Sequence, residues 1–390
     1  MENKPVILQV LPALGTGGVE RGTVDMAKAI IQAGGIAIVA SEDGIWQHYL
    51  EKIGAIYIHL PLSSKNPWII WKNHYALIKI IQYYKVDIVH ARSRAPAWSA
   101  WLAARKCHIR FVTTWHGVFQ AKWFGKRWYN QVMTKGEKVI AISHYIANHL
   151  QQEYHVNQQK LCIIPRGVDL TIFDPSLPLG NRISSLAQSW GISEEQKILL
   201  LPGRITEWKG HKLLLQAFAE LKFNHPNWIC IFVGPAKEKD HFLKELLDLA
   251  DYLKIKDSIY FVGNSQDMPA VYALANIVVV PSLKPEPFGR VVIEAQAMEK
   301  PVVVANHGGA AETVEENVTG YLFKPGSVNN LVFVLDQLME KTDADLNWIG
   351  RLAREAVQKK YTLQQMQCKT LSVYNEILPA ENKLKINDVS

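Results

Sequence analysis

Two glutamates, Glu286 and Glu294, flank a turn in this sequence and are well suited to binding a polar ligand. They follow the apolar run Ile277–Val280, which is typical of a buried strand. The loop after this run breaks at Pro285 and Pro287, and we expect a helix from about residue 288, with Glu294 two turns into it. Because ionised carboxylates only accept hydrogen bonds, the pair is suited to sugar hydroxyls.

The first turn of that helix is a candidate anion site. The expected amides are those of Phe288, Gly289 and Arg290. The first amides of a helix have no partner within the helix and carry a partial positive charge. After a parallel strand they form a phosphate site. The stretch therefore predicts phosphate on the amides and sugar hydroxyls on the two glutamates.

Two basic residues, Arg204 and Lys209, follow a second apolar run at 198–203. Two fixed cations can neutralise a diphosphate leaving group without a metal ion. A structural salt bridge is the alternative interpretation of the same residues.

Short apolar runs alternate with helical patterns through both halves of the chain, which predicts an α/β fold with doubly wound parallel sheets. Such sheets bind ligands beyond the carboxyl ends of their strands. A polar stretch at 171–193 reads as a linker, so we expect domains at 1–180 and 190–362 and a final helix within 363–390. The strand runs are 6–10, 36–40, 55–60, 86–89, 110–114, 139–142 and 161–164, then 198–203, 228–234, 259–263 and 277–280.

The two glutamates, separated by seven residues, are followed by the segments 295–301 and 308–312. This pattern resembles family 4 of the retaining glycosyltransferases, which includes bacterial lipopolysaccharide and capsule enzymes. The resemblance covers most of the chain. It implies the GT-B fold, in which two Rossmann-like domains face each other across a cleft. The N-terminal domain would bind the acceptor and the C-terminal domain the nucleotide-sugar donor.

The resemblance also implies roles for individual residues. Arg204 and Lys209 would hold the diphosphate together with the first-turn amides. Glu294 would bind the ribose hydroxyls and Glu286 the hydroxyls of the donor sugar. His116 follows the run at 110–114 and would line the reaction centre, so His116 and Glu286 are the expected catalytic residues.

Two glycine turns are further candidates for donor binding. Gly17 and Gly18 follow the first strand run and, by resemblance, lie under the donor pyrophosphate. The turn at Gly263 and Asn264 would contact the nucleotide base. The first turn also partly matches a dinucleotide fingerprint, but Glu20 occupies the third glycine position. NAD(P) binding and a turn without a ligand therefore remain open there.

Arg92 and Arg94 follow the run at 86–89. They are the candidate acceptor-binding residues, because this position lies at the carboxyl edge of the expected sheet. A solvated loop is the alternative.

The basic residues are concentrated in the N-terminal half. Residues 1–180 contain 20 Lys and Arg and 11 Asp and Glu, whereas residues 181–390 contain 23 and 25. Seven of the 12 tryptophans lie within residues 59–140. The expected helix at 66–85 carries lysines and aromatic residues on separate faces, which indicates either an ordinary packed helix or one at a membrane surface. An anionic, membrane-borne glycan or lipid-linked acceptor fits this half.

Several other classes of protein fit less well. The sequence contains no long uncharged apolar run and four scattered cysteines, which argues against a transmembrane helix, a disulfide framework and a zinc site. We expect a cytoplasmic location, either free or peripheral at the inner face of the plasma membrane. No nucleic-acid motif accompanies the basic residues. Asp343 and Asp345 match a metal-binding pattern, but they open a helix, where N-capping explains them.

The expected reaction is therefore retaining sugar transfer from a nucleotide diphosphate sugar, without a cofactor or metal. A UDP-sugar is favoured over a GDP-sugar, and lipopolysaccharide or surface-polysaccharide synthesis is the expected context. A glycosidase would also use two carboxylates, but it would not need two cations for a diphosphate. Nucleotide-sugar epimerisation and non-catalytic nucleotide-sugar binding remain the alternatives.

Overall fold

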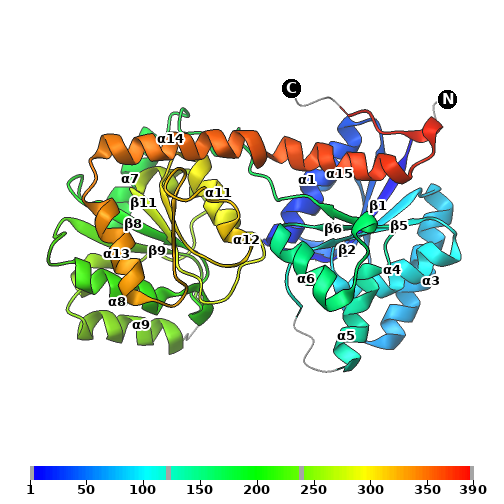
Figure 1. Ribbon diagram of the computed structural model, residues 1–390. Helices are drawn as coiled ribbons and strands as arrows, with labels where there is room; N and C mark the ends of the chain where they lie inside the picture. The colour runs from blue at the N-terminus through cyan, green and yellow to red at the C-terminus, as the bar shows by residue number, and fades with distance from the viewer. Residues whose placement is uncertain (1–3, 120–123, 237–240, 387–390) are drawn as a thin grey trace. The chain divides into compact units, whose positions relative to one another are not determined.

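The computed structural model describes residues 4–119, 124–236 and 241–386, and Figure 1 shows its helices and strands. The chain divides into two compact units. Unit 1 contains Met1–Pro165 and Gln364–Ser390, and unit 2 contains Arg166–Leu363. Each unit is built on one parallel sheet with helices packed against it, so the expected α/β class with two Rossmann-like parts is confirmed.

Unit 1 contains a seven-stranded sheet in the order β3-β2-β1-β4-β5-β6-β7, with every neighbouring pair parallel. All seven strand runs expected from the sequence form strands, with ends shifted by up to four residues, because each run is short, apolar and bounded by turn residues. The strands are β1 (Val6–Leu14), β2 (Ile36–Gly44), β3 (Ile56–His59), β4 (Ile88–Ala91), β5 (Arg110–Trp115), β6 (Lys138–Ala141) and β7 (Leu161–Ile163).

The last helix of the chain, α15 (Leu363–Ile377), is anchored in unit 1 by buried polar contacts. The hydroxyl of Tyr374 lies 2.6 Å from Nδ1 of His90, whose Nε2 lies 2.7 Å from Oγ1 of Thr114. The other unit 1 helices are α1 (Gly18–Gln32), α2 (Gln47–Lys52), α3 (Pro67–Tyr84), α4 (Arg94–Lys106), α5 (Phe124–Gln131) and α6 (His144–Tyr154).

Unit 2 contains a six-stranded parallel sheet in the order β10-β9-β8-β11-β12-β13. The strands are β8 (Lys197–Pro202), β9 (Trp228–Val233), β10 (Ile259–Phe261), β11 (Ile277–Val280), β12 (Val302–Ala305) and β13 (Tyr321–Phe323). The helices are α7 (Gly180–Trp190), α8 (His211–Leu221), α9 (His241–Tyr252), α10 (Met268–Leu274), α11 (Arg290–Ala297), α12 (Gly308–Ala311), α13 (Val328–Met339) and α14 (Asp343–Lys360). Short 3-10 turns are η3 (Glu207–Lys209) and η4 (Lys256–Ser258) in unit 2, and η1 (Val132–Thr134), η2 (Gln158–Lys160) and η5 (Ala380–Asn382) in unit 1.

The division between the units lies earlier than the linker expected at 171–193. Apolar residues of that stretch pack against the core of unit 2, and they include Phe173, Leu177 and Ile183. Burial of these side chains holds the stretch in unit 2, although its prolines and polar residues resemble those of a linker.

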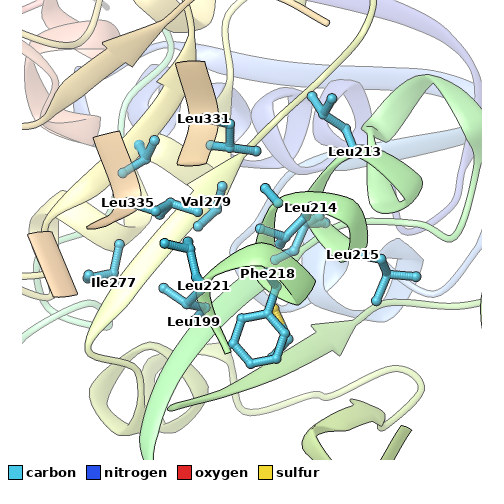
Figure 2. Close-up of a cluster of buried hydrophobic side chains, with 14 of the residues drawn as sticks. Leu199, Leu213, Leu214, Leu215, Phe218, Leu221, Ile277, Val279, Leu331 and Leu335 are labelled. Atoms are coloured by element: carbon cyan, nitrogen blue, oxygen red, sulfur yellow. The ribbon is translucent and has the colours of Figure 1, made fainter. Parts of the chain in front are cut away.

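Each face of the unit 2 sheet has its own apolar core. Figure 2 shows one of them, in which leucines of α8 meet Ile277 and Val279 of β11 and Leu331 and Leu335 of α13. The opposite core contains the alternate residues of the same strands with α10 and α11. Burial on both faces explains why these strands are apolar throughout and do not alternate.

The strand order reverses between β1 and β4 in unit 1 and between β8 and β11 in unit 2. At such a point the flanking connections run to opposite faces of the sheet and leave a crevice at the carboxyl ends of the strands. The loops after β8 and β11, which carry the expected donor-binding residues, therefore lie side by side. No helix within the described residues is long and apolar enough to cross a bilayer.

Candidate active site

The loops after β8 and β11 are in direct contact. The amide of Leu283 donates to the carbonyl oxygen of Trp208 over 2.7 Å. Gly210 has φ +79°, and a Cβ added there would lie 1.9 Å from the carbonyl oxygen of Pro281. Only glycine fits this left-handed, crowded position, so the glycine after Lys209 sets the distance between the two loops.

Glu286 is buried and forms hydrogen bonds with two side chains. Its Oε1 accepts from Nζ of Lys209 over 2.8 Å and from Oγ of Ser282 over 2.5 Å. Nε2 of His307 lies 2.7 Å from the carbonyl oxygen of Ser282. The resemblance implied a diphosphate as the partner of Lys209 and a sugar as the partner of Glu286, and a structural salt bridge was the alternative for the lysine. In this structure the two residues form an ion pair with each other.

The backbone of Glu286 is held by the glycine pair that follows β12. The amide of Gly309 donates to the carbonyl oxygen of Glu286 over 2.7 Å. Gly308 has φ +69°, and a Cβ there would lie 2.6 Å from the same oxygen. The Gly-Gly step therefore lets the β12–α12 turn support the glutamate loop directly.

Glu294 is also buried and held from two sides. Its Oε1 accepts from Nη2 of Arg290 over 2.8 Å, one helical turn earlier. Its Oε2 accepts from the hydroxyl of Tyr272 over 3.1 Å. Burial raises the pKa of Tyr272 well above its ordinary value, and the neighbouring Glu294 carboxylate raises it further. The tyrosine therefore stays protonated and donates to the carboxylate.

The helix after the glutamate loop begins at Arg290, two residues later than the sequence predicted. Gly289 is its N-cap with φ +81°, and a Cβ there would lie 2.5 Å from Cβ of Ala310. This left-handed residue interrupts the helical backbone. The amides of Phe288 and Gly289 consequently precede the helix, and Glu294 lies one turn into it instead of two. Of the three expected amides, only that of Arg290 belongs to the first turn.

The remaining unit 2 candidates lie at the same edge of the sheet. Arg204 follows β8 and is exposed. Gly263 follows β10 with φ +71°, and its carbonyl oxygen accepts from the amide of Gly234 over 2.7 Å. Asn264 is exposed. The donor-binding candidates of unit 2 thus lie beyond the carboxyl ends of its strands, at one edge of the sheet: Arg204, Asn264, Glu286 and Glu294.

The unit 1 candidates occupy the corresponding edge of the other sheet. Gly17 is the N-cap of α1, and Gly18 is its first helical residue. His116 directly follows β5 and is partly buried. These positions agree with the strand and helix pattern of the sequence, and the roles of the residues remain predictions.

Arg92 and Arg94 do not form the solvated loop that the sequence left open. Arg92 is buried, and its Nε and Nη2 have no hydrogen-bond partner among the residues that the structure describes. Arg94 is the first residue of α4; its Nη1 donates to Oδ1 of Asn130 over 2.8 Å, and its guanidinium lies 3.7 Å from the centre of the Phe119 ring. Arg94 therefore packs α4 against the following segment, and the acceptor roles of both arginines remain predictions.

Three supporting residues were missed by sequence reasoning. Ser282 lies between β11 and Glu286. Serine is common in loops after strands, so its type alone did not mark it as a partner of the glutamate. Tyr272 lies on α10, 22 residues before Glu294, and no local pattern connects the two. His307 comes directly before Gly308 and Gly309, and its distance along the sequence from Glu286 matches no motif that would single it out. Only the fold brings these side chains to the glutamates.

The Asp-x-Asp pattern at residues 343–345 opens a helix, as expected, but only Asp345 takes part in its cap, and Asp343 instead accepts from Nζ of Lys197 over 2.8 Å. Thr342 and Asp345 form a reciprocal capping box at the start of α14. Among the described residues, no group of three or more His, Cys, Asp and Glu side chains is arranged to hold a metal ion.

Comparison with known proteins agrees with this geometry. Residues 16–172 match the family model Glycosyltransferase Family 4, and residues 183–354 match Glycosyl transferases group 1. A glycosyltransferase structure from Rickettsia africae is 38% identical, covers 97% of this chain and 100% of its own, and superposes with a TM-score of 0.90.

Two proteins of lower sequence identity are also similar to this chain. Anabaena Alr3699/HepE, solved in complex with UDP and glucose, is 23% identical, with a TM-score of 0.82 and coverage of 95% of this chain and 100% of its own. An uncharacterized glycosyltransferase of Methanocaldococcus jannaschii is 27% identical over 61% of this chain, and the match spans 59% of that protein. The chain belongs to the family 4 glycosyltransferases of the GT-B fold.

Proposed function

We propose that this protein transfers a sugar from a nucleotide diphosphate sugar to a glycan or lipid-linked acceptor, with retention at the anomeric carbon and without a metal ion. One observation carries this proposal. Two buried glutamates, each tethered by hydrogen bonds, share the carboxyl edge of the unit 2 sheet with Arg204 and Lys209. That combination suits a ligand with both hydroxyls and a diphosphate.

In the proposed donor complex, Arg204, Lys209 and the amides around Arg290 bind the diphosphate. Glu294 accepts hydrogen bonds from the ribose hydroxyls, and Glu286 accepts hydrogen bonds from the hydroxyls of the donor sugar. Gly17 and Gly18 approach the pyrophosphate, and the turn at 263–264 contacts the base. In the donor complex these cations and amides lie against the diphosphate, so they stabilise the negative charge that develops on it as it leaves.

The proposed transfer step uses no protein nucleophile. The leaving phosphate takes the proton of the acceptor hydroxyl on the face from which it departs, and His116 contacts the donor sugar during this step. The contribution of the protein is orientation and charge stabilisation.

The proposed donor is a UDP-sugar, in preference to a GDP-sugar. Support comes from Anabaena Alr3699/HepE, which has this fold and was solved in complex with UDP and with UDP-glucose. Backbone groups at 263–264 would contact the base, so side-chain identity says little about base choice.

The proposed acceptor is anionic and membrane-borne, and the proposed location is the inner face of the plasma membrane. Trp68, Trp71 and Tyr75 form an exposed stripe on α3. Nζ of Lys72 lies 5.9 Å from the centre of the Trp68 ring. The stripe lies opposite the buried side of α3, which contains Asn73, Leu77 and Ile81. Outward aromatic residues beside lysines suit an anionic lipid surface. Lipopolysaccharide or surface-polysaccharide synthesis is the proposed context.

Thermal shift with UDP, GDP and ADP in the presence of EDTA tests the donor site. We expect UDP to raise the melting temperature of the wild type by several degrees at saturation. Glu294→Ala should lose most of that shift, measured against its own melting temperature without ligand. If none of the three nucleotides stabilised the wild type, or if Glu294→Ala responded fully, the donor assignment would be wrong.

A further inference from the structure

We propose that the Lys209–Glu286 ion pair is an exchangeable contact that lets the enzyme bind a nucleotide sugar more tightly than the nucleoside diphosphate that remains after transfer. The inference rests on the proposed roles of these two residues in donor binding. It adds a function for their contact with each other, which would favour release of the product.

The pair is well formed and nearly shut off from solvent. Nζ of Lys209 lies 2.8 Å from Oε1 of Glu286, and the two side chains are only 12% and 9% exposed. At this burial the pair is not an ordinary surface salt bridge, and breaking it without replacement leaves an uncompensated charge at a cost. Any ligand that recruits Lys209 must therefore first take it from Glu286.

Glu286 is the fixed partner. Its carbonyl oxygen accepts from the amide of Gly309 over 2.7 Å, and its carboxylate keeps the 2.5 Å hydrogen bond from Ser282 when Lys209 leaves. Ser282 is in turn contacted by His307 through its carbonyl oxygen. The backbone and the side chain of the glutamate are thus held independently of the lysine.

Lys209 is the partner whose side chain can change position. Its flexible stem runs beside Gly203, where a Cβ would lie 3.5 Å from the Cδ and Cε atoms of the lysine. Its ammonium group lies 4.5 Å from the centre of the Trp208 ring. An ammonium group on a four-carbon stem can change partners, and the face of the tryptophan ring attracts the cation in either position.

The exchange has different consequences for donor and product. When a nucleotide sugar binds, its diphosphate takes Lys209 while the sugar hydroxyls donate to the Glu286 carboxylate in place of the lysine, so both charges keep partners. When the nucleoside diphosphate binds alone, Glu286 loses the lysine and gains no hydroxyl. Glu286 therefore competes with the product for Lys209 and weakens product binding after the sugar has left.

The test is the affinity of UDP and of UDP-glucose for the wild type and for Glu286→Gln, measured by calorimetry in EDTA. Glutamine keeps the shape and can still accept from Ser282, but it holds Lys209 weakly. We expect UDP to bind about fivefold more tightly to the variant. We expect the preference for UDP-glucose over UDP to fall. In a Lys209→Met background, the gain for UDP should disappear, as a double-mutant cycle requires.

Glu245→Gln is the matched control, because Glu245 pairs with Lys212 on the exposed surface of the same unit and should change neither affinity. If Glu286 contacted only the sugar, UDP affinity would be unchanged in Glu286→Gln. If Glu286 held Lys209 in its binding position, UDP would bind more weakly. Either result overturns the exchange while leaving the donor site in place. Failure of the wild type to bind both ligands would instead overturn the proposed function.

Discussion

At the scale of single residues, each glutamate of the site is held by a hydroxyl from a different part of unit 2. Ser282 donates to Glu286 and Tyr272 donates to Glu294. Buried carboxylates with fixed partners keep one orientation, which is what recognition of sugar hydroxyls requires. The hydroxyl donors therefore belong to the function as much as to the stability of the protein.

Tyr272→Phe removes the hydroxyl from Glu294 and changes little else in the core. We expect a loss of about 1 to 2 kcal/mol in the free energy of unfolding, because a buried carboxylate loses a donor. We also expect weaker UDP binding, since Glu294 is proposed to bind the ribose. Urea unfolding and calorimetry measure the two effects. Unchanged UDP affinity in a folded variant would remove Tyr272 from the binding role.

His211 predicts a pH-dependent stability. Burial lowers the pKa of His211 from its ordinary value to about 4, although its contact with the Thr206 carbonyl opposes the shift. Since the folded-state pKa lies below the unfolded one, the unfolded chain binds more protons between pH 6.5 and 4. The contribution of His211 to stability is therefore complete above about pH 6.5 and is lost as the pH falls.

His211→Asn should flatten this dependence. Asparagine does not titrate, and its amide can still donate to Thr206. We expect the wild type to lose about 2 kcal/mol more than the variant between pH 7.5 and pH 5. Urea unfolding at both pH values gives the comparison. Parallel losses in the two proteins would show that His211 does not titrate as its burial requires.

Much of the site could be predicted at the residue scale, and the failures have physical reasons. Glu286, Glu294, Arg204 and Lys209 follow buried strands, so their sheet edge could be read from local pattern. Burial of Arg92 could not, because it depends on which helices cover the sheet. The same holds for the contact between Lys209 and Glu286, which are 77 residues apart.

At the scale of elements, the site depends on how closely the loops after β8 and β11 approach each other. The left-handed Gly210 permits that approach, and a second left-handed glycine, Gly289, explains why the helix starts later than predicted. Apolar periodicity continues through 288–293, so the pattern predicted a helix there. A Cβ at position 289 would collide with Ala310 of α12, and no local pattern reveals that this tertiary neighbour leaves room only for glycine.

Gly210→Ala tests the contact between the two loops. The new Cβ would collide with the Pro281 carbonyl, so we expect a loss of about 2 to 4 kcal/mol in unfolding free energy and weaker UDP binding. Gly191→Ala is the control. Gly191 also has a left-handed φ, of +68°, but no atom lies within 4 Å of an added Cβ.

The control should cost only about 1 kcal/mol and leave UDP binding unchanged. Urea unfolding and calorimetry compare the two variants. Equal effects would mean that backbone strain alone matters and that the contact with Pro281 does not.

At the scale of the whole molecule, charge and aromatic residues are unevenly shared between the two halves of the sequence. The basic excess lies entirely in residues 1–180, which include the exposed aromatic stripe of α3. This asymmetry was visible in the sequence. Whether the α3 aromatic residues were buried or exposed was not, because helical spacing alone left a packed helix and a surface helix equally open.

Replacing Trp68 and Trp71 together by serine tests the proposed membrane surface. Both side chains are exposed, so the fold should persist. Binding to vesicles containing anionic phospholipid should fall about tenfold, and wild-type binding should weaken in high salt. Co-sedimentation measures both effects.

Trp348→Ser is the matched control, since Trp348 is 57% exposed on α14 of unit 2. It should bind vesicles like the wild type. Wild-type binding that is negligible, or equal for neutral and anionic vesicles, would remove the membrane proposal without affecting the donor site.

The most direct test of the central claim is release of UDP from UDP-sugars in the presence of EDTA, with water or an added glycan acceptor taking the sugar, compared between the wild type and Arg204→Ala. Arg204 is exposed, so its removal should leave the fold intact. We predict that the wild type releases UDP from at least one UDP-sugar and that the variant is slower by about a hundredfold or more. Equal rates in the two proteins, a strict requirement for a divalent metal, or no release from any nucleotide sugar would contradict a metal-independent donor site at the β8 and β11 loops.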